Sequence, residues 1–280
     1  MRKLLLGAAA ISLSGCSFLG IGGGNSQYGY NAPVYGASYG APASKCAPGH
    51  AVLANGNCLS RLNIEGGIGV SYNVGGDVIT GDEATFAGTD VRNVEFKDAY
   101  ERGRRAEAGF SYATNANTKV TAMAFIDKAE SAGEQDFGTI DGRDFTGSLS
   151  DYRSTGLELG VRRYFNPRPA PIVRSLRPYI EARVGAAYQD SVYIDNAAVG
   201  GDALGRVALK ESGWVPSAAG LIGVETPLTR FSTIGLETGI RYTGKTDAVD
   251  DNFGPAPFEG LAEGGERISV PLMLRGRYRF

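Results

Sequence analysis

The sequence is poor in long apolar runs. Although 42% of its 280 residues are hydrophobic, no stretch after the N-terminus reaches the roughly 18 consecutive apolar residues of a membrane-spanning helix. A helical span is therefore excluded on length. An excess of one charge is also missing, because the formal net charge is −2. Without a global basic field, there is no electrostatic reason to expect a nucleic-acid partner.

Histidine is nearly absent, and His50 is the single copy. It lies in a Pro-Gly turn context ahead of the regular part of the chain. No Ser-His-acid or Asp-His arrangement can be built around the later residues without a second histidine. We therefore expect no enzymatic activity, no catalytic residue and no cofactor.

Cysteine is scarce as well, and the three copies leave an odd one that needs an explanation in a secreted chain. The N-terminus offers one. Arg2 and Lys3 precede an apolar stretch, residues 4–13, which is too short to span a bilayer and is typical of a signal peptide. Leu13-Ser14-Gly15-Cys16 follows and resembles a bacterial lipobox, in which the cysteine is acylated and becomes the mature N-terminus. The alternative is an ordinary signal peptide with a chance cysteine.

If Cys16 carries lipid, Cys46 and Cys58 remain as a pair in an oxidising compartment. The loop between them contains Pro-Gly and Asn-Gly turn signals, and a disulfide that closes it would add about 3 kcal/mol of stability. A metal site is the competing interpretation. It would need more ligands than His50 supplies, so we expect no metal.

The composition divides the chain into four segments. Residues 1–15 are the predicted lipoprotein signal peptide, and residues 16–45 are a low-complexity tether of Gly, Tyr, Ser and Pro without apolar periodicity. Residues 46–60 form the predicted disulfide-closed loop. Residues 61–280 show a different texture and are predicted to form one domain.

This domain alternates between apolar and polar residues with a period of two, which is typical of strands with two different faces. The pattern occurs eight times. The third run is the weakest, because apolar residues occupy both of its faces. The runs cover residues 62–72, 104–113, 118–127, 156–162, 180–188, 220–225, 234–242 and 268–280.

The connections between these runs are of two kinds. Short turns are expected at 115–117, 166–178 and 227–230, whereas longer loops are expected at 75–100, 127–151, 189–212 and 243–266. Short periplasmic turns that alternate with long external loops are typical of outer-membrane barrels. A soluble β-sandwich also alternates but has no reason to sort its loops in this way. The fold class predicted is therefore all-β, an eight-stranded antiparallel transmembrane β-barrel with a flexible N-terminal tether.

The chain ends in Arg277-Tyr278-Arg279-Phe280. A terminal phenylalanine after alternating apolar residues resembles the assembly signal of outer-membrane proteins, and Phe280 would then be read by the barrel-assembly machinery. With eight strands, residues 61–280 resemble the family of small barrels that includes OmpA-, OmpX- and PagP-type proteins. The resemblance implies the bacterial outer membrane, with loops outside and the tether in the periplasm. The lipobox and the tether depart from the family's usual plan.

If the apolar face meets lipid, the opposite face carries charges of both signs in equal number. An eight-stranded barrel has room inside only for its own side chains, and buried charges must be paired. We therefore predict a closed, salt-bridged lumen made by Glu65, Arg105, Glu107, Glu158, Arg162, Glu181, Arg183, Glu225, Glu237, Arg241, Arg275 and Arg277.

These features predict a non-enzymatic lipoprotein with a structural or surface-interaction role, exerted through its external loops and its tether. A narrow pore is one alternative, and a lipid-modifying barrel enzyme, which by the family resemblance would need an active-site histidine, is another. The partners expected are outer-membrane lipid, surface glycolipid and an unidentified protein that binds the loops or the tether.

Two charged groups in or near the loops allow weaker hypotheses. Lys97, Arg102, Arg104 and Arg153 lie near the external strand ends and could bind glycolipid phosphates, although ordinary snorkelling also explains them. An acidic run at 247–266 could hold Ca²⁺, but it lacks the spacing of a known calcium loop, so a solvated loop is favoured.

Overall fold

A computed structural model describes residues 50–52, 58–80, 89–115, 117–165, 176–229, 231–247 and 265–279, with the side chains of 50–52 and 58–60 left out. All described residues belong to one compact unit. The predicted signal peptide and tether, and Cys16, Cys46 and Phe280, lie outside the described residues.

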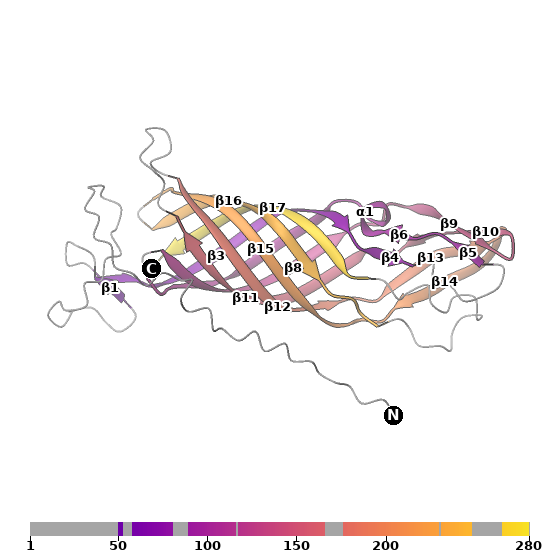
Figure 1. The fold of residues 1–280 in the computed structure, drawn as a ribbon, viewed down its shortest axis with the longest axis horizontal. Coiled ribbons are helices and arrows are strands. Elements are labelled where there is room, and N and C mark those ends of the chain that lie inside the picture. Colours follow the sequence, from indigo (N-terminus) through magenta and orange to yellow (C-terminus); the bar gives the residue numbers. More distant parts are fainter. Residues whose placement is uncertain are drawn as a thin grey trace, which may run out of the picture. The chain divides into compact units, whose positions relative to one another are not determined.

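Eight antiparallel strands close into a barrel (Figure 1), which confirms the predicted fold class. Each strand pairs with its neighbour in the barrel, and the last pairs with the first through Arg277↔Glu65 and eleven further partners. The strands are β3 (Leu62–Gly75), β7 (Gly103–Ala113), β8 (Thr118–Ala129), β11 (Tyr152–Tyr164), β12 (Arg177–Gln189), β15 (Gly213–Pro227), β16 (Ser232–Thr243) and β17 (Arg267–Arg279).

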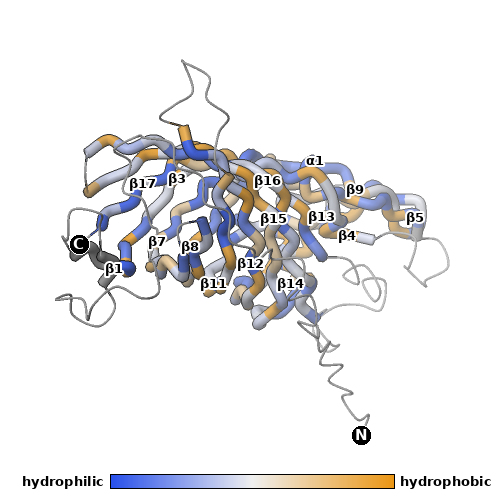
Figure 2. Tube along the Cα trace, turned by 60° about the vertical axis from the view of Figure 1, so that its left-hand side comes forward, coloured by the Kyte–Doolittle hydropathy of each residue, from blue (hydrophilic) through white to orange (hydrophobic). Residues whose placement is uncertain are grey.

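Apolar and polar residues alternate along most of the barrel strands, as the change of colour along the tubes in Figure 2 shows. On β16, Leu236 and Ile240 are 54% and 61% exposed, whereas Glu237 between them is 1% exposed. The apolar residues therefore point outward and the charged residues point into the barrel. An apolar belt on the outer surface of a barrel requires hydrocarbon around it.

Aromatic side chains mark both borders of the apolar belt. Tyr72, Trp214 and Tyr242 are exposed near one end of the barrel, and Tyr112 and Tyr278 are exposed near the other. Such girdles are typical of the two membrane interfaces.

The two ends of the barrel differ. At the turn end, the connections between strands are short, for example 114–117 between β7 and β8. Two further strands, β1 (His50–Val52) and β2 (Cys58–Ser60), pair with each other ahead of β3, and Val52 lies opposite Cys58. The other end, which we call the loop end, carries the long connections.

Three of the long connections contain strands within their described residues and are not simple loops, contrary to the expectation from the sequence. Two of them are β-hairpins whose strands pair with each other, and together with a strand from the first connection they form a separate sheet in the order β14-β13-β10-β9-β5. We call it the loop-end sheet. Its strands are β5 (Thr89–Val91), β9 (Glu134–Ile140), β10 (Arg143–Leu149), β13 (Val192–Val199) and β14 (Asp202–Lys210).

The loop-end sheet has its own hydrophobic core. Phe137 and Phe145 are fully buried with ring centroids 5.2 Å apart, and Ile194 of the next strand is fully buried as well. The remaining elements of the first connection, β4 (Asp77–Ile79), β6 (Val94–Glu95) and the short helix α1 (Phe96–Ala99), contribute buried residues to the same cluster. Burial of this apolar surface, rather than the short strands alone, stabilises the sheet.

No helix among the described residues combines the length and the apolar character of a membrane-spanning helix.

Candidate functional site: the charged barrel interior

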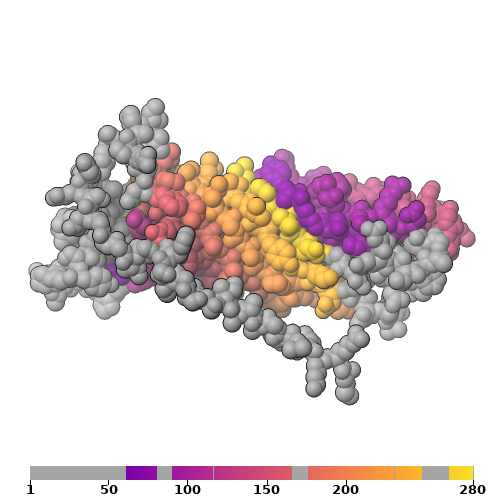
Figure 3. Space-filling view, viewed as in Figure 1, coloured from indigo at the N-terminus to yellow at the C-terminus, as the bar shows by residue number. Residues whose placement is uncertain are grey.

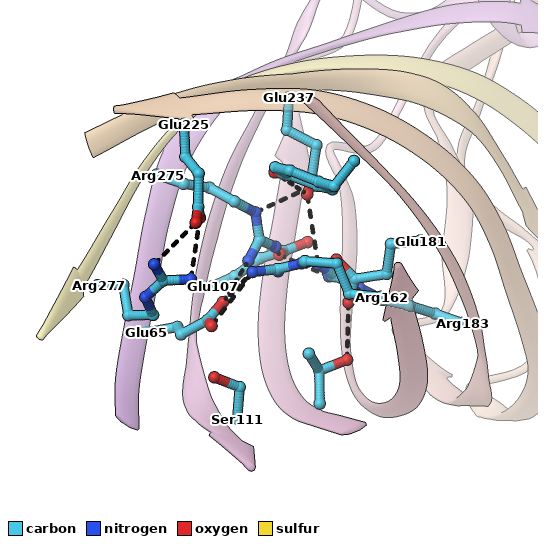
Figure 4. Close-up of polar contacts among 12 residues, drawn as sticks. Glu65, Glu107, Ser111, Arg162, Glu181, Arg183, Glu225, Glu237, Arg275 and Arg277 are labelled. Atoms are coloured by element: carbon cyan, nitrogen blue, oxygen red, sulfur yellow. Dashed lines mark hydrogen bonds and ion pairs between the residues drawn. The ribbon is translucent and has the colours of Figure 1, made fainter. Parts of the chain in front are cut away.

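All twelve charged residues that the sequence assigns to the lumen lie inside the barrel, and each is at most 6% exposed. They come from seven of the eight strands, because only β8 contributes none of them. Figure 4 shows part of this network, with the carboxylates and guanidinium groups pointing toward one another across the interior.

Glu107 on β7 is the centre of this network. Its Oε1 accepts hydrogen bonds from Arg105 at 2.7 Å and from Arg241 at 2.6 Å. Its Oε2 accepts a hydrogen bond from Arg183 at 2.8 Å and another from Arg275. One carboxylate therefore joins guanidinium groups from four strands, and each of them has further acidic partners.

A second set of pairs lies toward the turn end. Arg162 lies 2.9 Å from Glu65 and 2.8 Å from Glu181, and Glu181 also accepts a hydrogen bond from the Thr121 hydroxyl at 2.6 Å. The last pair joins Arg277 to Glu225 through two hydrogen bonds of 2.7 and 2.9 Å. These contacts distribute the charge of each carboxylate over several donors.

A third level at the loop end contains residues that the sequence analysis missed. Asp127 of β8 lies 3.3 Å from Arg267 and 3.5 Å from Arg105. The Arg267 guanidinium also stacks on the ring of Tyr152, 4.6 Å from its centroid, and Tyr152 belongs to the core of the loop-end sheet. This level connects the ionic interior to the apolar cluster above it.

Lys119 and Arg279 also point inward and are buried. Lys119 Nζ has no hydrogen-bond partner among the described residues and lies 5.2 Å from the centroid of the Tyr164 ring. With these residues, Asp127 and Arg267, the described barrel strands bury seven carboxylates and nine cations. The interior therefore does not have the equal number of acidic and basic residues that the sequence analysis expects, because cations are in excess among the described residues.

Glycines on the inner face of the barrel make room for apolar side chains there. Met123 and Phe125 of β8 point inward and are 1% and 7% exposed. A Cβ atom at Gly109 would lie 2.9 Å from the Met123 sulfur, and one at Gly156 would lie 2.8 Å from the Phe125 ring. These glycines leave the space that Met123 and Phe125 occupy, so the structure shows which face of β8 points inward, a point that the sequence left ambiguous.

The charged side chains of the interior pair with one another. Every one of the twelve charged side chains has an ionic partner inside the barrel. No group of three or more metal-ligating side chains occurs among the described residues. His50 lies in β1 and Cys58 begins β2, and neither side chain is described.

The four candidate glycolipid contacts separate into two groups. Lys97 lies on α1, which packs against β3 near the loop end, and it pairs with Glu95 at 2.8 Å. Arg104 and Arg153 lie on the outer face of β7 and β11, and Arg102 directly precedes β7. All three arginines are exposed. Lys97 is therefore placed with the loop-end elements, not with the other three.

No family model matches the chain, and no curated protein matches it. Solved barrels match with low sequence identity. Neisserial surface protein A is 12% identical, covers 79% of this chain and 99% of its own, and has a TM-score of 0.40. The outer membrane protein OprG of Pseudomonas aeruginosa is 16% identical, covers 78% and 95%, and has a TM-score of 0.45. The outer membrane protease OmpT of Escherichia coli is 8% identical, covers 79% and 98%, and has a TM-score of 0.40.

The class follows from the barrel itself. A closed eight-stranded barrel with an apolar outer belt, two aromatic girdles and a charged interior is the architecture of an outer-membrane β-barrel. Within that class, this chain is a small barrel that carries a folded sheet on its loop end.

Proposed function

We propose that this protein is a non-enzymatic outer-membrane lipoprotein that presents the loop-end sheet outside the cell for surface interaction. The observation that carries the proposal is the combination of an interior occupied by ion pairs and a loop end folded around its own core. The barrel serves as a rigid anchor, and the sheet provides the contact surface.

Transport through the lumen has little support from this geometry. Charged pairs occupy the interior from Arg277 near the turn end, through Glu107, to Arg267 near the loop end. Beyond Arg267 stands the aromatic group of Phe96, Tyr100 and Tyr152, whose ring centroids are 5.7 to 6.0 Å apart. In the space-filling view, the wall formed by β15 to β17 has no opening on the face shown (Figure 3). A permanent channel would require breaking several of these pairs at once.

The solvent-facing side of the loop-end sheet is polar and suits recognition of a protein partner. Arg206 stacks on Tyr193 with its guanidinium carbon 3.9 Å from the ring centroid, and it pairs with Asp195 at 2.9 Å. Arg143 of β10 and Asp202 of β14 form a second exposed pair, on two strands that flank β13. An aromatic ring combined with arginine is frequent at the centre of protein interfaces.

The N-terminal features are part of the proposal. Cys16 would carry lipid and hold the periplasmic tether at the membrane, and Cys46 and Cys58 would form a disulfide in the oxidising periplasm. Cys16→Ser should abolish incorporation of labelled fatty acid. Denatured, unreduced protein should show no reactive thiol, and two thiols that map to Cys46 and Cys58 would contradict the disulfide.

The test of the function has two arms. In planar bilayers, the purified protein should show no steady conductance, while a porin in the same apparatus gives stable steps. Large, stable steps from this protein would make the pore alternative correct. Wild type and His50→Ala should be equally inactive on lipid acyl esters and on peptides, and hydrolysis lost only in His50→Ala would make the enzyme alternative correct.

The second arm tests the orientation. Epitope tags inserted at Asp141–Gly142 or Gly200–Gly201, the turns of the two hairpins of the loop-end sheet, should be labelled on intact cells. A tag after Asn115 at the turn end should be labelled only after the cells are opened. The reverse labelling would place the loop-end sheet in the periplasm and refute the proposal.

A further inference from the structure

Three cations lie side by side on the outer face of the barrel at the loop end. The strand register places Arg104 of β7 directly opposite Lys128 of β8, and Lys128 directly opposite Arg153 of β11. All three are exposed. We call them the cationic row. Like charges on directly opposed residues of neighbouring strands repel each other, so the row needs anions near it.

Protein carboxylates neutralise the row only at its edges. Arg104 lies 3.5 Å from Glu130, and Arg153 lies 3.9 Å from Asp190, with all four side chains about half or more exposed. Lys128 in the middle forms no ion pair within the described part of the chain. Exposed contacts of this length contribute little, so the centre of the row is open to an external anion.

The height of the row matches a membrane surface. Arg104 precedes Tyr112 by eight residues on β7, and Tyr112 belongs to the aromatic border at the turn end. This separation is about 27 Å along a strand at roughly 3.4 Å per residue, or about 20 Å along the axis of a barrel with strands tilted by roughly 40°. An apolar belt of about 25 Å therefore ends close to the row. The register agrees, because Arg104 lies directly opposite Val70, two residues before Tyr72 of the aromatic border at the loop end, and long cationic side chains at this height reach the lipid headgroups.

A groove lies beside the row on the lipid-facing surface. It has a volume of about 710 Å³. Its floor is a row of directly opposed small residues on four neighbouring strands, Gly276, Gly66, Ala108 and Ala124.

Larger residues, including Ile68 and Ile126, line the groove on the side of the cationic row. Ala106 lies between Ile68 and Ile126 in the register and directly precedes Ala108 on the outward face, so the groove opens toward Arg104 at this point.

The packing inside the barrel does not require the glycines of this floor. A Cβ atom at Gly276 would meet nothing within 4 Å, and one at Gly66 would meet only the Glu107 carbonyl oxygen at 3.6 Å. The space they leave therefore opens outward, to the hydrocarbon. A cleft of this kind beneath a cationic row fits an acyl chain attached to a phosphorylated headgroup.

We propose that β7, β8 and β11 bind a phosphorylated glycolipid of the outer leaflet. Its phosphate lies on the cationic row, with Lys128 at the centre, and one acyl chain lies over Ala106 in the groove. This inference rests on the proposed orientation, in which the loop end faces outward. Lysine and arginine together bind phosphate through both charge and multiple N–H donors.

The experiment measures lipid retained by the full-length protein. Wild type is placed in nanodiscs that contain either diphosphorylated lipid A or phosphatidylglycerol at the same mole fraction, extracted into mild detergent, and weighed by native mass spectrometry. Wild type should retain lipid A at least tenfold more often than phosphatidylglycerol. The double variant Arg104→Gln/Lys128→Gln should lose at least tenfold of this retention, and Gly276→Leu should reduce it several-fold.

Two matched variants serve as controls. Arg206→Gln removes an exposed cation from the loop-end sheet, and Gly220→Leu fills a lipid-facing position of β15 where a Cβ atom would also meet nothing within 4 Å. Both should retain lipid A as wild type does. Heat-modifiable migration of every variant in gels verifies that the barrel is folded.

Equal retention by Arg104→Gln/Lys128→Gln and by wild type would overturn the proposal, as would equal retention of the two lipids. Unchanged retention by Gly276→Leu would remove the acyl-chain groove from it. The tag experiment separates this outcome from a failure of the proposed function, because it reports the orientation of the loop end without any lipid measurement.

Discussion

Arg241 of β16 and Glu158 of β11 meet across the barrel interior, with Nη1 of the arginine 2.7 Å from both oxygens of the carboxylate. The two residues are separated by 83 positions in the sequence, and both are almost fully buried. Arg241 also donates to Glu107 at 2.6 Å. The pair therefore joins two distant strands to the centre of the ionic network.

Glu158→Ala should strongly destabilise the barrel. It removes the paired acceptor of Arg241 and the 3.6 Å contact to Arg105, which leaves buried cations with one carboxylate fewer. The cost of breaking a buried pair is about 3–5 kcal/mol. Urea unfolding in lipid vesicles, followed by the fluorescence of Trp214, the only tryptophan, measures the change.

The double variant Glu158→Ala/Arg241→Ala should lose less stability than the sum of the two single variants, because neither charge is then left without the other. Leu159→Ala is the matched control on the same strand, because the Leu159 side chain lies on the outer face of the barrel, where it is 64% exposed. An additive double variant would mean that the pair contributes no coupling.

The sequence predicts a strand well when the two faces of the strand differ in polarity. The alternation in 234–242 places β16 to within two residues of its bounds, Ser232–Thr243, because lipid on one side and charge on the other impose a strict period of two. On β8 the inner face carries Met123 and Phe125, and two apolar faces hide the period. Asp127 and Lys119 were missed for this reason.

The loop-end sheet was missed for two different reasons. The β9–β10 hairpin had a local signal in the sequence, the dipeptide Asp141-Gly142, which favours a tight hairpin turn. In the structure both residues have the positive φ angles that such a turn requires, 51° and 70°. The pairing of β10 with β13 has no local signal, and β14 pairs with β13 through three register shifts. Likewise, the sequence identifies the lumen charges but not their partners, because Glu107 and Arg241 are 134 residues apart and only the closed register brings them together.

Leu236→Arg should destabilise the protein by about 2–4 kcal/mol if the residue lies near the bilayer midplane. Leu236 is 54% exposed on the outer face and stands between Val224 and Leu274 of the neighbouring strands, so an arginine there would enter hydrocarbon. Leu236→Ile is the control and should unfold as wild type does. If Leu236→Arg unfolds at the same urea concentration as wild type, this face does not contact lipid.

Lys210 at the end of β14 should titrate well below an ordinary lysine. Burial is the main cause that lowers its pKa to about 8, with Lys245 adding to the shift and Glu266 and Asp77 opposing it. Between pH 8 and pH 10, the unfolded chain binds more protons at this residue than the folded one. The contribution of Lys210 to stability therefore rises with pH across this window.

Carbon NMR of protein labelled at the lysine ε position measures this pKa directly. One resonance should titrate near pH 8 and should disappear in Lys210→Arg. A Lys210 resonance that titrates above pH 10 would show that the side chain is solvated.

Phe145→Ala should unfold the loop-end sheet while the barrel stays intact. Phe145 is fully buried against Phe137 and belongs to the apolar cluster of the loop end, not to the ionic interior. Truncating a buried phenylalanine costs about 3–5 kcal/mol, which is large for a five-stranded sheet built on short strands.

Trypsin should then cut at Arg143 and Arg206, whose side chains are already about 60% exposed but are held in strands, and heat-modifiable migration of the barrel should persist. Thr146→Ala, the next residue of β10 and only partly buried, should resist trypsin as wild type does. If Phe145→Ala also abolishes heat-modifiable migration, the sheet and the barrel unfold as one unit, and the loop-end sheet is then a structural part of the barrel rather than a separate surface presented by it.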